Sequence, residues 1–378
     1  MIRHILITGG AGFIGSNLSL ALLAKGHKVR VLDNLASQIH GEREMDSSLY
    51  QSIAGKVDFI RGDVTSRQDL LNAMKGVDTI VHLAAETGTG QSMYAISRYA
   101  EVNVGGTALM LDLIANEQLP IQRIVVASSR AIYGEGKYQC QEHGVCFPSE
   151  RTEERMSRGE FEPVCPVCFR VVEMLPTDEN SALHPTSVYG VTKLTQEQLV
   201  MSVGKAIGIS TIAYRYQNVY GPGQSLSNPY TGILSIFSTR IRNGRGINIF
   251  EDGLESRDFV YISDVVEATV AGIEYPDLII DSFNVGSGKG TDVLTVANLL
   301  LSHFGGESEI KVSGQYRAGD IRHNAADNSK ISRTMGYSPK VTIEEGLLHF
   351  VNWVKGECIE VDLYEESIKE MRRRGLFK

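Results

Sequence analysis

Short apolar runs alternate with amphipathic stretches through the first 133 residues of the chain. The runs HILIT, KVRVLD, DTIVHLAA and RIVVASS have the length and the β-branched content of buried strands. The stretches between them, NLSLALLAKG, DLLNAMKG and ALMLDLIANE, place their apolar residues at helical spacing. Strands that alternate with helices in this way predict an α/β fold, a Rossmann-type doubly wound parallel sheet with helices on both faces.

The alternation stops between residues 137 and 180. This segment is polar and contains four of the five cysteines, which is typical of an insertion. Helical periodicity resumes at VYGVTKLTQEQLV, and TIAYRYQNVYG predicts a further strand. We expect a Rossmann domain over 1–190 that contains the Cys-rich insertion 137–180. Residues 191–378 are expected to form mainly a smaller α/β substrate-binding lobe, from which some segments return to the first domain.

Composition narrows the class of protein. The net charge of −8 is unfavourable for a nucleic-acid-binding surface, and the 42% of hydrophobic residues is ordinary for a globular enzyme. No stretch approaches the roughly 20 apolar residues that span a bilayer. The N-terminal MIRHILITGG enters a strand directly, without the segments of a signal peptide. We therefore expect a cytoplasmic protein with no membrane or nucleic-acid partner, whose cysteines form no disulfide framework.

A glycine loop follows the first predicted strand. ILITGGAGFIGS places Gly9, Gly12 and Gly15 before the next helix, where glycine permits a tight turn and lets the backbone approach a pyrophosphate. The second strand ends at Asp33, where a carboxylate accepts hydrogen bonds from the adenosine ribose and repels a 2′-phosphate. The pattern predicts NAD as the cofactor in preference to NADP. Asp63, at the end of the third strand, is a candidate for contact with adenine.

Tyr189 and Lys193 lie four residues apart in SVYGVTK and therefore share one face of a helix. An ammonium group beside a phenol favours the tyrosinate and lowers the phenol pKa from about 10. Ser129 ends the strand RIVVASS at the carboxyl edge of the sheet, where ligands of such folds bind. These residues predict a base, Tyr189, and a hydroxyl group that holds the reacting oxygen and relays its proton.

Ten motifs follow one another along the chain: TGGAGFIG, VLDNL, HLAA, VNVGGT, SSRAIYG, YGVTK, RYQNVYGPG, RDFVYISD, FNVGSG and GDIRHNAAD. Together they resemble the extended short-chain dehydrogenase/reductase family, in its nucleotide-sugar epimerase/dehydratase branch. Four segments are similar to the subgroup that acts on dTDP-6-deoxyhexoses such as dTDP-L-rhamnose in cell-surface polysaccharide synthesis: ETGTGQSMY, RAIYGEGKYQC, CPVC and YQNVYGPGQSLSNPYTGILSIF. The resemblance implies NAD, a nucleotide-sugar substrate and a homodimer.

The resemblance also implies roles for individual residues. Ser129, Tyr189 and Lys193 would form the catalytic group, with Lys193 also holding the nicotinamide ribose. The NAD site would gain residues beside the glycine loop and at the strand ends, namely Phe13, Ile14, Asn34, Val64, Leu83, Ala84 and Ala85.

The resemblance places the substrate against the second half of the chain. Asn218 would contact the diphosphate, and Arg257 and Arg317 would neutralise it, for which an arginine fork is well suited. Asp320 would hold the nucleotide ribose. Glu86, in HLAAET, is a lone carboxylate near the substrate.

The residues after Ser129 bear on the reaction. Family dehydratases carry an Asp-Glu pair there, because elimination of water needs a further acid and base. Here the positions hold Arg130 and Ala131, which favours epimerisation at C4, with the 4-keto sugar turning over before it takes the hydride back. Gln217, where many relatives have an aromatic residue, indicates a pocket unlike the common UDP-galactose type. The alternatives are a UDP-hexose or UDP-uronate 4-epimerase, a nucleotide-4-keto-sugar reductase, and a non-enzymatic NAD-binding protein.

The insertion contains two pairs of metal-ligand residues. Cys140 and His143 have C-x-x-H spacing, and after 21 intervening residues Cys165 and Cys168 have C-x-x-C spacing. Two chelating turns with four such donors predict a structural zinc site that orders a segment with few apolar residues. Cys146 is an alternative to His143 as the fourth ligand. A redox dithiol and unpaired thiols are the other interpretations of these cysteines.

Overall fold

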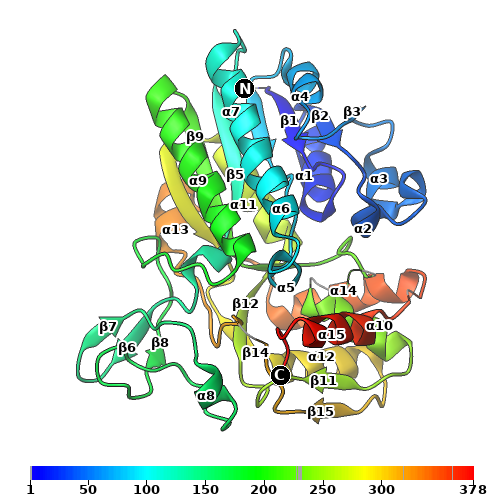
Figure 1. Cartoon of the computed structure of the whole chain (residues 1–378). Coiled ribbons are helices and arrows are strands. Elements are labelled where there is room, and N and C mark those ends of the chain that lie inside the picture. The colour runs from blue at the N-terminus through cyan, green and yellow to red at the C-terminus, as the bar shows by residue number, and fades with distance from the viewer. Residues whose placement is uncertain (1, 227, 229–231, 318, 360) are drawn as a thin grey trace.

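The computed structural model describes residues 2–226, 228, 232–317, 319–359 and 361–378. Within them, a seven-stranded parallel sheet has the order β13-β9-β5-β4-β1-β2-β3 (Figure 1). The chain moves outward from β1 in both directions, as in a doubly wound fold, so the switch point for ligand binding lies at β1. The strands are β1 (His4–Thr8), β2 (Lys28–Asp33), β3 (Asp58–Arg61), β4 (Thr79–His82), β5 (Arg123–Ser129), β9 (Ser210–Tyr216) and β13 (Ile280–Val285).

Helices cover both faces of this sheet, which confirms the predicted fold class. Ile5 and Ile7 of β1 pack with Leu18 in one apolar cluster, whereas Leu6 packs with Met110 in another. Successive strand residues point to opposite faces, and both faces of a buried parallel sheet are apolar. The first cluster holds α1 (Phe13–Ala24) and α11 (Ile262–Glu274), and the second holds α4 (Arg67–Met74), α7 (Gly106–Asn116) and α9 (Val188–Ile207).

Shorter elements connect the strands at the carboxyl edge of the sheet. They are α2 (Ser37–His40), η1 (Glu44–Asp46), α3 (Ser48–Ile53), α5 (Thr89–Ser92), α6 (Ile96–Tyr99), η2 (Ala100–Gly105) and η3 (Arg130–Tyr133). The helix α13 (Ser329–Met335) follows all the strands in the chain and packs beside β13.

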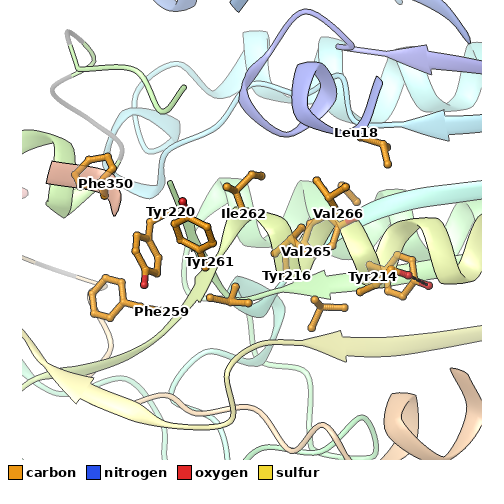
Figure 2. Close-up of a cluster of buried hydrophobic side chains, with 14 of the residues drawn as sticks. Leu18, Tyr214, Tyr216, Tyr220, Phe259, Tyr261, Ile262, Val265, Val266 and Phe350 are labelled. Atoms are coloured by element: carbon orange, nitrogen blue, oxygen red, sulfur yellow. Dashed lines mark hydrogen bonds between the residues drawn. The ribbon is translucent and has the colours of Figure 1, made fainter. Parts of the chain in front are cut away.

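A second group of elements lies below the sheet in Figure 1. Its apolar core is continuous with that of the sheet: Figure 2 shows Leu18, Val265 and Val266 in the same cluster as Tyr220 and Phe350. This packing holds the carboxyl edge of the sheet against the second group, so both can contribute to one site. The elements are β10 (Asn218–Tyr220), α10 (Ile233–Arg242), β11 (Ile247–Ile249), β12 (Ser256–Tyr261), β14 (Gly290–Asp292), α12 (Val293–Phe304), β15 (Ile310–Val312), α14 (Ile343–Gly356) and α15 (Tyr364–Arg373).

The insertion is ordered as a small sheet in the order β7-β6-β8, apart from the main core (Figure 1). It consists of β6 (Tyr138–Cys140), β7 (Gly144–Cys146), α8 (Glu153–Met156) and β8 (Glu173–Met174). Its own buried cluster contains Tyr138, Val172 and three of the cysteines. Within the described residues, no helix is long and apolar enough to cross a membrane.

Candidate functional site

The glycine loop joins β1 to α1 beside the end of β4. Gly9 has a φ of +69°, and a Cβ atom there would lie 2.8 Å from the backbone nitrogen of Ala84. A Cβ atom on Gly15 would lie 2.4 Å from the carbonyl oxygen of Gly9. Gly12 is the N-cap of α1, and no side chain caps this end, so the first N–H groups of the helix are available to a phosphate. The loop therefore has the shape that a pyrophosphate site requires.

Asp33 ends β2 and connects the glycine loop to the loop that follows β2. Its carboxylate accepts hydrogen bonds from the N–H groups of Ala11 and Leu35, both at 2.9 Å. Burial raises the pKa of Asp33, and these two bonds oppose the rise. Beyond β3, the Asp63 carboxylate accepts a hydrogen bond from the Asn34 amide at 2.8 Å. The structure thus brings the two predicted acids and Asn34 together at the carboxyl edge.

The other residues predicted for NAD lie around the same edge. Leu83, Ala84 and Ala85 follow β4. Phe13 and Ile14 open α1 and pack against the larger apolar cluster. Val64 follows β3 and packs against Gly106 at the start of α7. A Cβ atom added at Gly106 would lie only 2.9 Å from the Val64 side chain, so the glycine allows α7 to approach the end of β3 closely.

Ser129 and Tyr189 meet where β5 and α9 approach each other. Ser129 is the last residue of β5 and is hydrogen-bonded with the phenol of Tyr189. The side chain of Ser187 caps α9 by accepting a hydrogen bond from the Gly190 N–H at 3.1 Å, which fixes the turn that carries Tyr189. The ring of Tyr99 meets the Tyr189 ring edge-on, with the centroids 6.5 Å apart.

The electrostatics of Tyr189 differ from the prediction. Burial raises its pKa, and the hydrogen bond with Ser129 and the positive charge of Arg130 oppose this rise. Lys193 instead donates a hydrogen bond to Gln196 Oε1 at 2.8 Å. Burial lowers the pKa of Lys193 to about 7. The prediction that Lys193 lowers the Tyr189 pKa was wrong for this structure, because helical spacing places two Cβ atoms on one face but does not direct a long side chain.

The residues predicted to bind the diphosphate gather around Asp320. Its carboxylate lies 2.8 Å from Arg317 Nη2 and 3.5 Å from Arg257 Nη2. Burial raises the pKa of Asp320, but the charges of Arg317, Arg257, Arg151 and Arg130 outweigh it and hold that pKa below its ordinary value. Burial also lowers the pKa of Arg130 to about 10. The structure therefore surrounds Asp320 with guanidinium groups, of which Arg130 also acts on Tyr189.

Two adjacent residues at the start of β10 carry buried polar atoms. The oxygen and nitrogen of the Gln217 amide and the oxygen of the Asn218 amide have no hydrogen-bond partner among the described residues. Buried amides without partners are costly unless a ligand or water completes their hydrogen bonds. Asn218 was predicted to contact substrate, and Gln217 was noted as different from many relatives.

Several residues around the site were not assigned from the sequence. Arg130 follows Ser129 directly, so its place near Ser129 and Tyr189 could have been inferred. Asn103 accepts a hydrogen bond from the Glu86 N–H at 2.8 Å and donates one to Thr192 at 3.0 Å, which only the fold reveals. The Glu86 carboxylate is paired with Arg98, 2.8 Å away, so it is not a free carboxylate in this structure.

The NAD dependent epimerase/dehydratase family model matches residues 5–153 and 170–286. The chain belongs to this family. A dTDP-L-rhamnose 4-epimerase from Burkholderia thailandensis is 38% identical over 94% of this chain and 96% of its own length. A putative UDP-glucose 4-epimerase from Methanocaldococcus jannaschii is 29% identical over 93% of this chain and 98% of its own.

Solved structures of family members share the fold. The UDP-glucuronic acid 4-epimerase from Bacillus cereus, in complex with UDP-glucuronic acid and NAD, has a TM-score of 0.76 at 26% identity, covering 93% of this chain and 99% of its own. The UDP-glucose 4-epimerase from Thermotoga maritima, with UDP-glucose, has a TM-score of 0.74 at 29% identity and the same coverage. The comparisons confirm the predicted family, the use of NAD and the enzyme class, an NAD-dependent nucleotide-sugar epimerase.

The family match is interrupted in the insertion, where the structure brings together Cys140, His143, Cys165 and Cys168. The Cys140 sulfur lies 3.6 Å from His143 Nδ1 and 3.7 Å from the Cys168 sulfur, and the Cys165 sulfur lies 3.7 Å from His143 Nδ1. Ligands about 2.0–2.3 Å from a tetrahedral zinc ion are roughly 3.5–3.8 Å apart. These three distances match the spacing in a zinc shell, all four donor atoms lie within 4.8 Å of one another, and Cys146 is not in the group.

Proposed function

We propose that this epimerase interconverts the C4 epimers of a dTDP-6-deoxyhexose such as dTDP-L-rhamnose. The observation that carries the proposal is the 38% identity with the Burkholderia dTDP-L-rhamnose 4-epimerase over almost the full length of both chains. The relatives described above that are named for UDP-sugars are 26–29% identical. The same site chemistry also suits a UDP-hexose or UDP-uronate, which is the second candidate.

The residues around Ser129 support a mechanism of transient oxidation. Bound NAD, for which the glycine loop and Asp33 provide a fitting site, supplies the hydride acceptor for C4. Tyr189 takes the proton of the C4 hydroxyl, while Ser129 holds the same oxygen and relays the proton. The positive charge of Arg130 favours the tyrosinate that this step requires. Lys193 is proposed to hold the nicotinamide ribose, and Tyr189 returns its proton after the 4-keto sugar has turned over.

The charges around Asp320 support a diphosphate site. Four arginines act on Asp320, and one of them, Arg151, is itself paired with Glu135 and Glu251. Arg257 and Arg317 pair with Asp320 directly, and a nucleotide diphosphate, which carries two negative charges when esterified at both ends, suits such guanidinium groups. We propose that Arg257 and Arg317 bind the diphosphate, that Asn218 assists them, and that Asp320 turns to the nucleotide ribose.

The substrate proposal is tested by incubating the purified protein, without added NAD, with dTDP-L-rhamnose, UDP-glucose, UDP-glucuronate and GDP-mannose. Proton NMR follows the C4 configuration of each sugar. Conversion of dTDP-L-rhamnose to its C4 epimer at a constant NAD redox state is the expected result. If only a UDP-sugar is converted, the dTDP-6-deoxyhexose proposal is wrong and the second candidate, a UDP-sugar 4-epimerase, takes its place. Turnover that begins only with a 4-keto sugar and NADH identifies a reductase and refutes the proposal.

We also propose that Cys140, His143, Cys165 and Cys168 bind a structural zinc ion. All four donor atoms lie within 4.8 Å of one another, which leaves a closed shell with no open position for catalysis. Elemental analysis should find one zinc per chain and none after the double substitution Cys165→Ser/Cys168→Ser. Zinc that persists in this variant, or is absent from the wild type, excludes the site.

Three further features remain part of the proposal. The resemblance to the family supports a homodimer, which light scattering coupled to size exclusion tests. It also supports a cytoplasmic location, which cell fractionation tests. A role in polysaccharide synthesis is tested by comparing the surface glycans of a deletion strain with those of the wild type. The division into a Rossmann domain over 1–190 and a substrate lobe over 191–378 is the working description of the chain, with β9 and β13 returning to the main sheet.

A further inference from the structure

The segment that interrupts the family match, residues 154–169, joins the proposed zinc site to the substrate side of the molecule. It carries Cys165 and Cys168 and also Glu162, which is separated from Cys165 by only two residues. We call the hairpin β6–β7 and the turn 163–172 the knuckle. Glu162 immediately precedes the turn 163–172 of the knuckle, so the position of its backbone depends on how firmly the knuckle is held.

The knuckle is held mainly by backbone hydrogen bonds and by a small buried core. Backbone bonds run from the Cys165 N–H to the Arg170 carbonyl at 2.8 Å and from the Val172 N–H to the Pro163 carbonyl at 3.2 Å. Its small core consists of Tyr138, Val172, Met174 and the cysteines themselves. A core of this size supplies little stability, so a metal ion is the natural source of the free energy that orders it.

From the knuckle, Glu162 reaches the loop 319–327. Its carboxylate lies 2.6 Å from Arg322 Nη2 and 3.2 Å from His323 Nε2. The Arg322 side chain is only 1% exposed and depends on Glu162, Glu251 and Asp252 for its charge pairing. Glu162 is one of three carboxylates that surround this buried guanidinium group, so it helps to determine where this loop lies.

The loop in turn orients Arg257. Its guanidinium donates hydrogen bonds to the carbonyl oxygens of Arg322 and Ile321, at 3.0 and 2.8 Å. The backbone of the loop thus aligns the fork of Arg257, and the loop also carries Asp320. The insertion holds the other end of this loop as well, because Thr177 pairs with the backbone of Ala325 at 2.8 Å and of Asp327 at 2.9 Å.

We infer that the zinc-bound knuckle is a positioning device for the diphosphate site, acting through Glu162 and Arg322 on Arg257 and Asp320. The inference rests on the zinc and substrate proposals above. Glu162 connects the knuckle to the loop of the binding side, whereas Ser129 and Tyr189 are held by β5 and α9. Loss of the metal or of Glu162 should therefore weaken nucleotide-sugar binding and leave the chemical step nearly intact.

The test compares Cys168→Ser, Glu162→Gln, the double variant and the control Cys146→Ala, all in the full chain. Cys146 is a buried cysteine of the same insertion that lies outside the four-donor group. Zinc content, KM and kcat for the sugar that turns over, and the Kd for dTDP and UDP are measured. Cys168→Ser should lose zinc and raise KM and Kd at least tenfold, with kcat within about threefold of wild type.

Glu162→Gln should keep its zinc and still raise KM and Kd, because it breaks the path beyond the metal. The double variant should show KM and Kd values no higher than those of the single variant that binds more weakly, because both changes interrupt the same path. Cys146→Ala should resemble the wild type. A zinc-loaded Glu162→Gln protein with unchanged KM and Kd overturns the inference, even if Cys168→Ser fails to fold.

The outcomes separate this inference from the proposals beneath it. Wild-type protein without zinc excludes the metal site and with it the inference. Zinc-free Cys168→Ser protein that folds and binds with unchanged KM and Kd leaves the zinc proposal intact but overturns the positioning role. Turnover of a UDP-sugar alone changes the substrate proposal, and the same comparison is then made with that sugar and UDP.

Discussion

Substitution of Tyr189 by Phe separates proton transfer from folding. It removes one hydroxyl group whose partner is Ser129 and keeps the ring that meets Tyr99 edge-on. One hydrogen bond contributes about 1 kcal/mol to stability. General base catalysis contributes about 10²–10⁴ in rate, or roughly 3–5 kcal/mol. Tyr189→Phe should therefore lose at least a hundredfold in kcat while its free energy of unfolding changes by about 1 kcal/mol.

The matched control is Tyr99→Phe. The Tyr99 hydroxyl donates hydrogen bonds to the carbonyl oxygens of Thr87 and Gly88, at 2.5 and 3.0 Å, and Tyr99 is fully buried. This variant should lose as much stability as Tyr189→Phe but far less activity. The assays are C4 conversion by NMR and unfolding by urea, with bound NAD measured in each protein. Tyr189→Phe protein that keeps its NAD and more than a tenth of wild-type kcat refutes the assignment of the base.

Further predictions concern single charged groups. Asp33→Asn should weaken NAD binding roughly ten- to hundredfold, because a hydrogen bond to a charged group contributes about 1.5–3 kcal/mol; calorimetry measures the Kd, and an unchanged value contradicts the role of Asp33. Burial lowers the pKa of Lys193 from 10.5 to about 7. Between pH 7 and 10, Lys193 is therefore protonated in the unfolded chain and mostly neutral in the folded protein. The NAD-free protein should gain stability as the pH rises through this range, because the unfolded chain binds more protons. Urea titrations at pH 7 and 9.5 measure this gain in the free energy of unfolding, and Lys193→Met should remove it. An equal gain in the wild type and in Lys193→Met would contradict the lowered pKa of Lys193. Burial raises the pKa of Glu255 from 4.5 to about 7, so its stabilising contribution is complete below pH 4.5 and is lost as the pH rises through 7. Between pH 5 and 8, the free energy of unfolding should therefore fall less for Glu255→Gln than for the wild type. The same pH dependence in both proteins would show that burial does not disfavour the charged form of this carboxylate.

Local patterns predicted the fold and much of the NAD site because their causes are local. A strand followed by glycines and a helix can form few other structures, and Asp33 lies at the end of a strand whose neighbours are set by the parallel order. Tyr189 and Lys193 share a helix face for the same reason. The direction of the Lys193 ammonium is not local, because it depends on Gln196 and on what else is buried beside it.

The sequence by itself determined the alternating elements, the glycine loop, the order of the catalytic motifs and the two ligand pairs of the insertion. Each is set by residues within a turn or two of one another, so spacing alone carries the information. Only the tertiary structure decided that Arg257 lies beside Asp320, that the charge of Arg130 acts on Tyr189, and that Glu162 of the insertion pairs with Arg322. These contacts join segments that are far apart in the chain, and their charges can be buried only because folding brings the partners together.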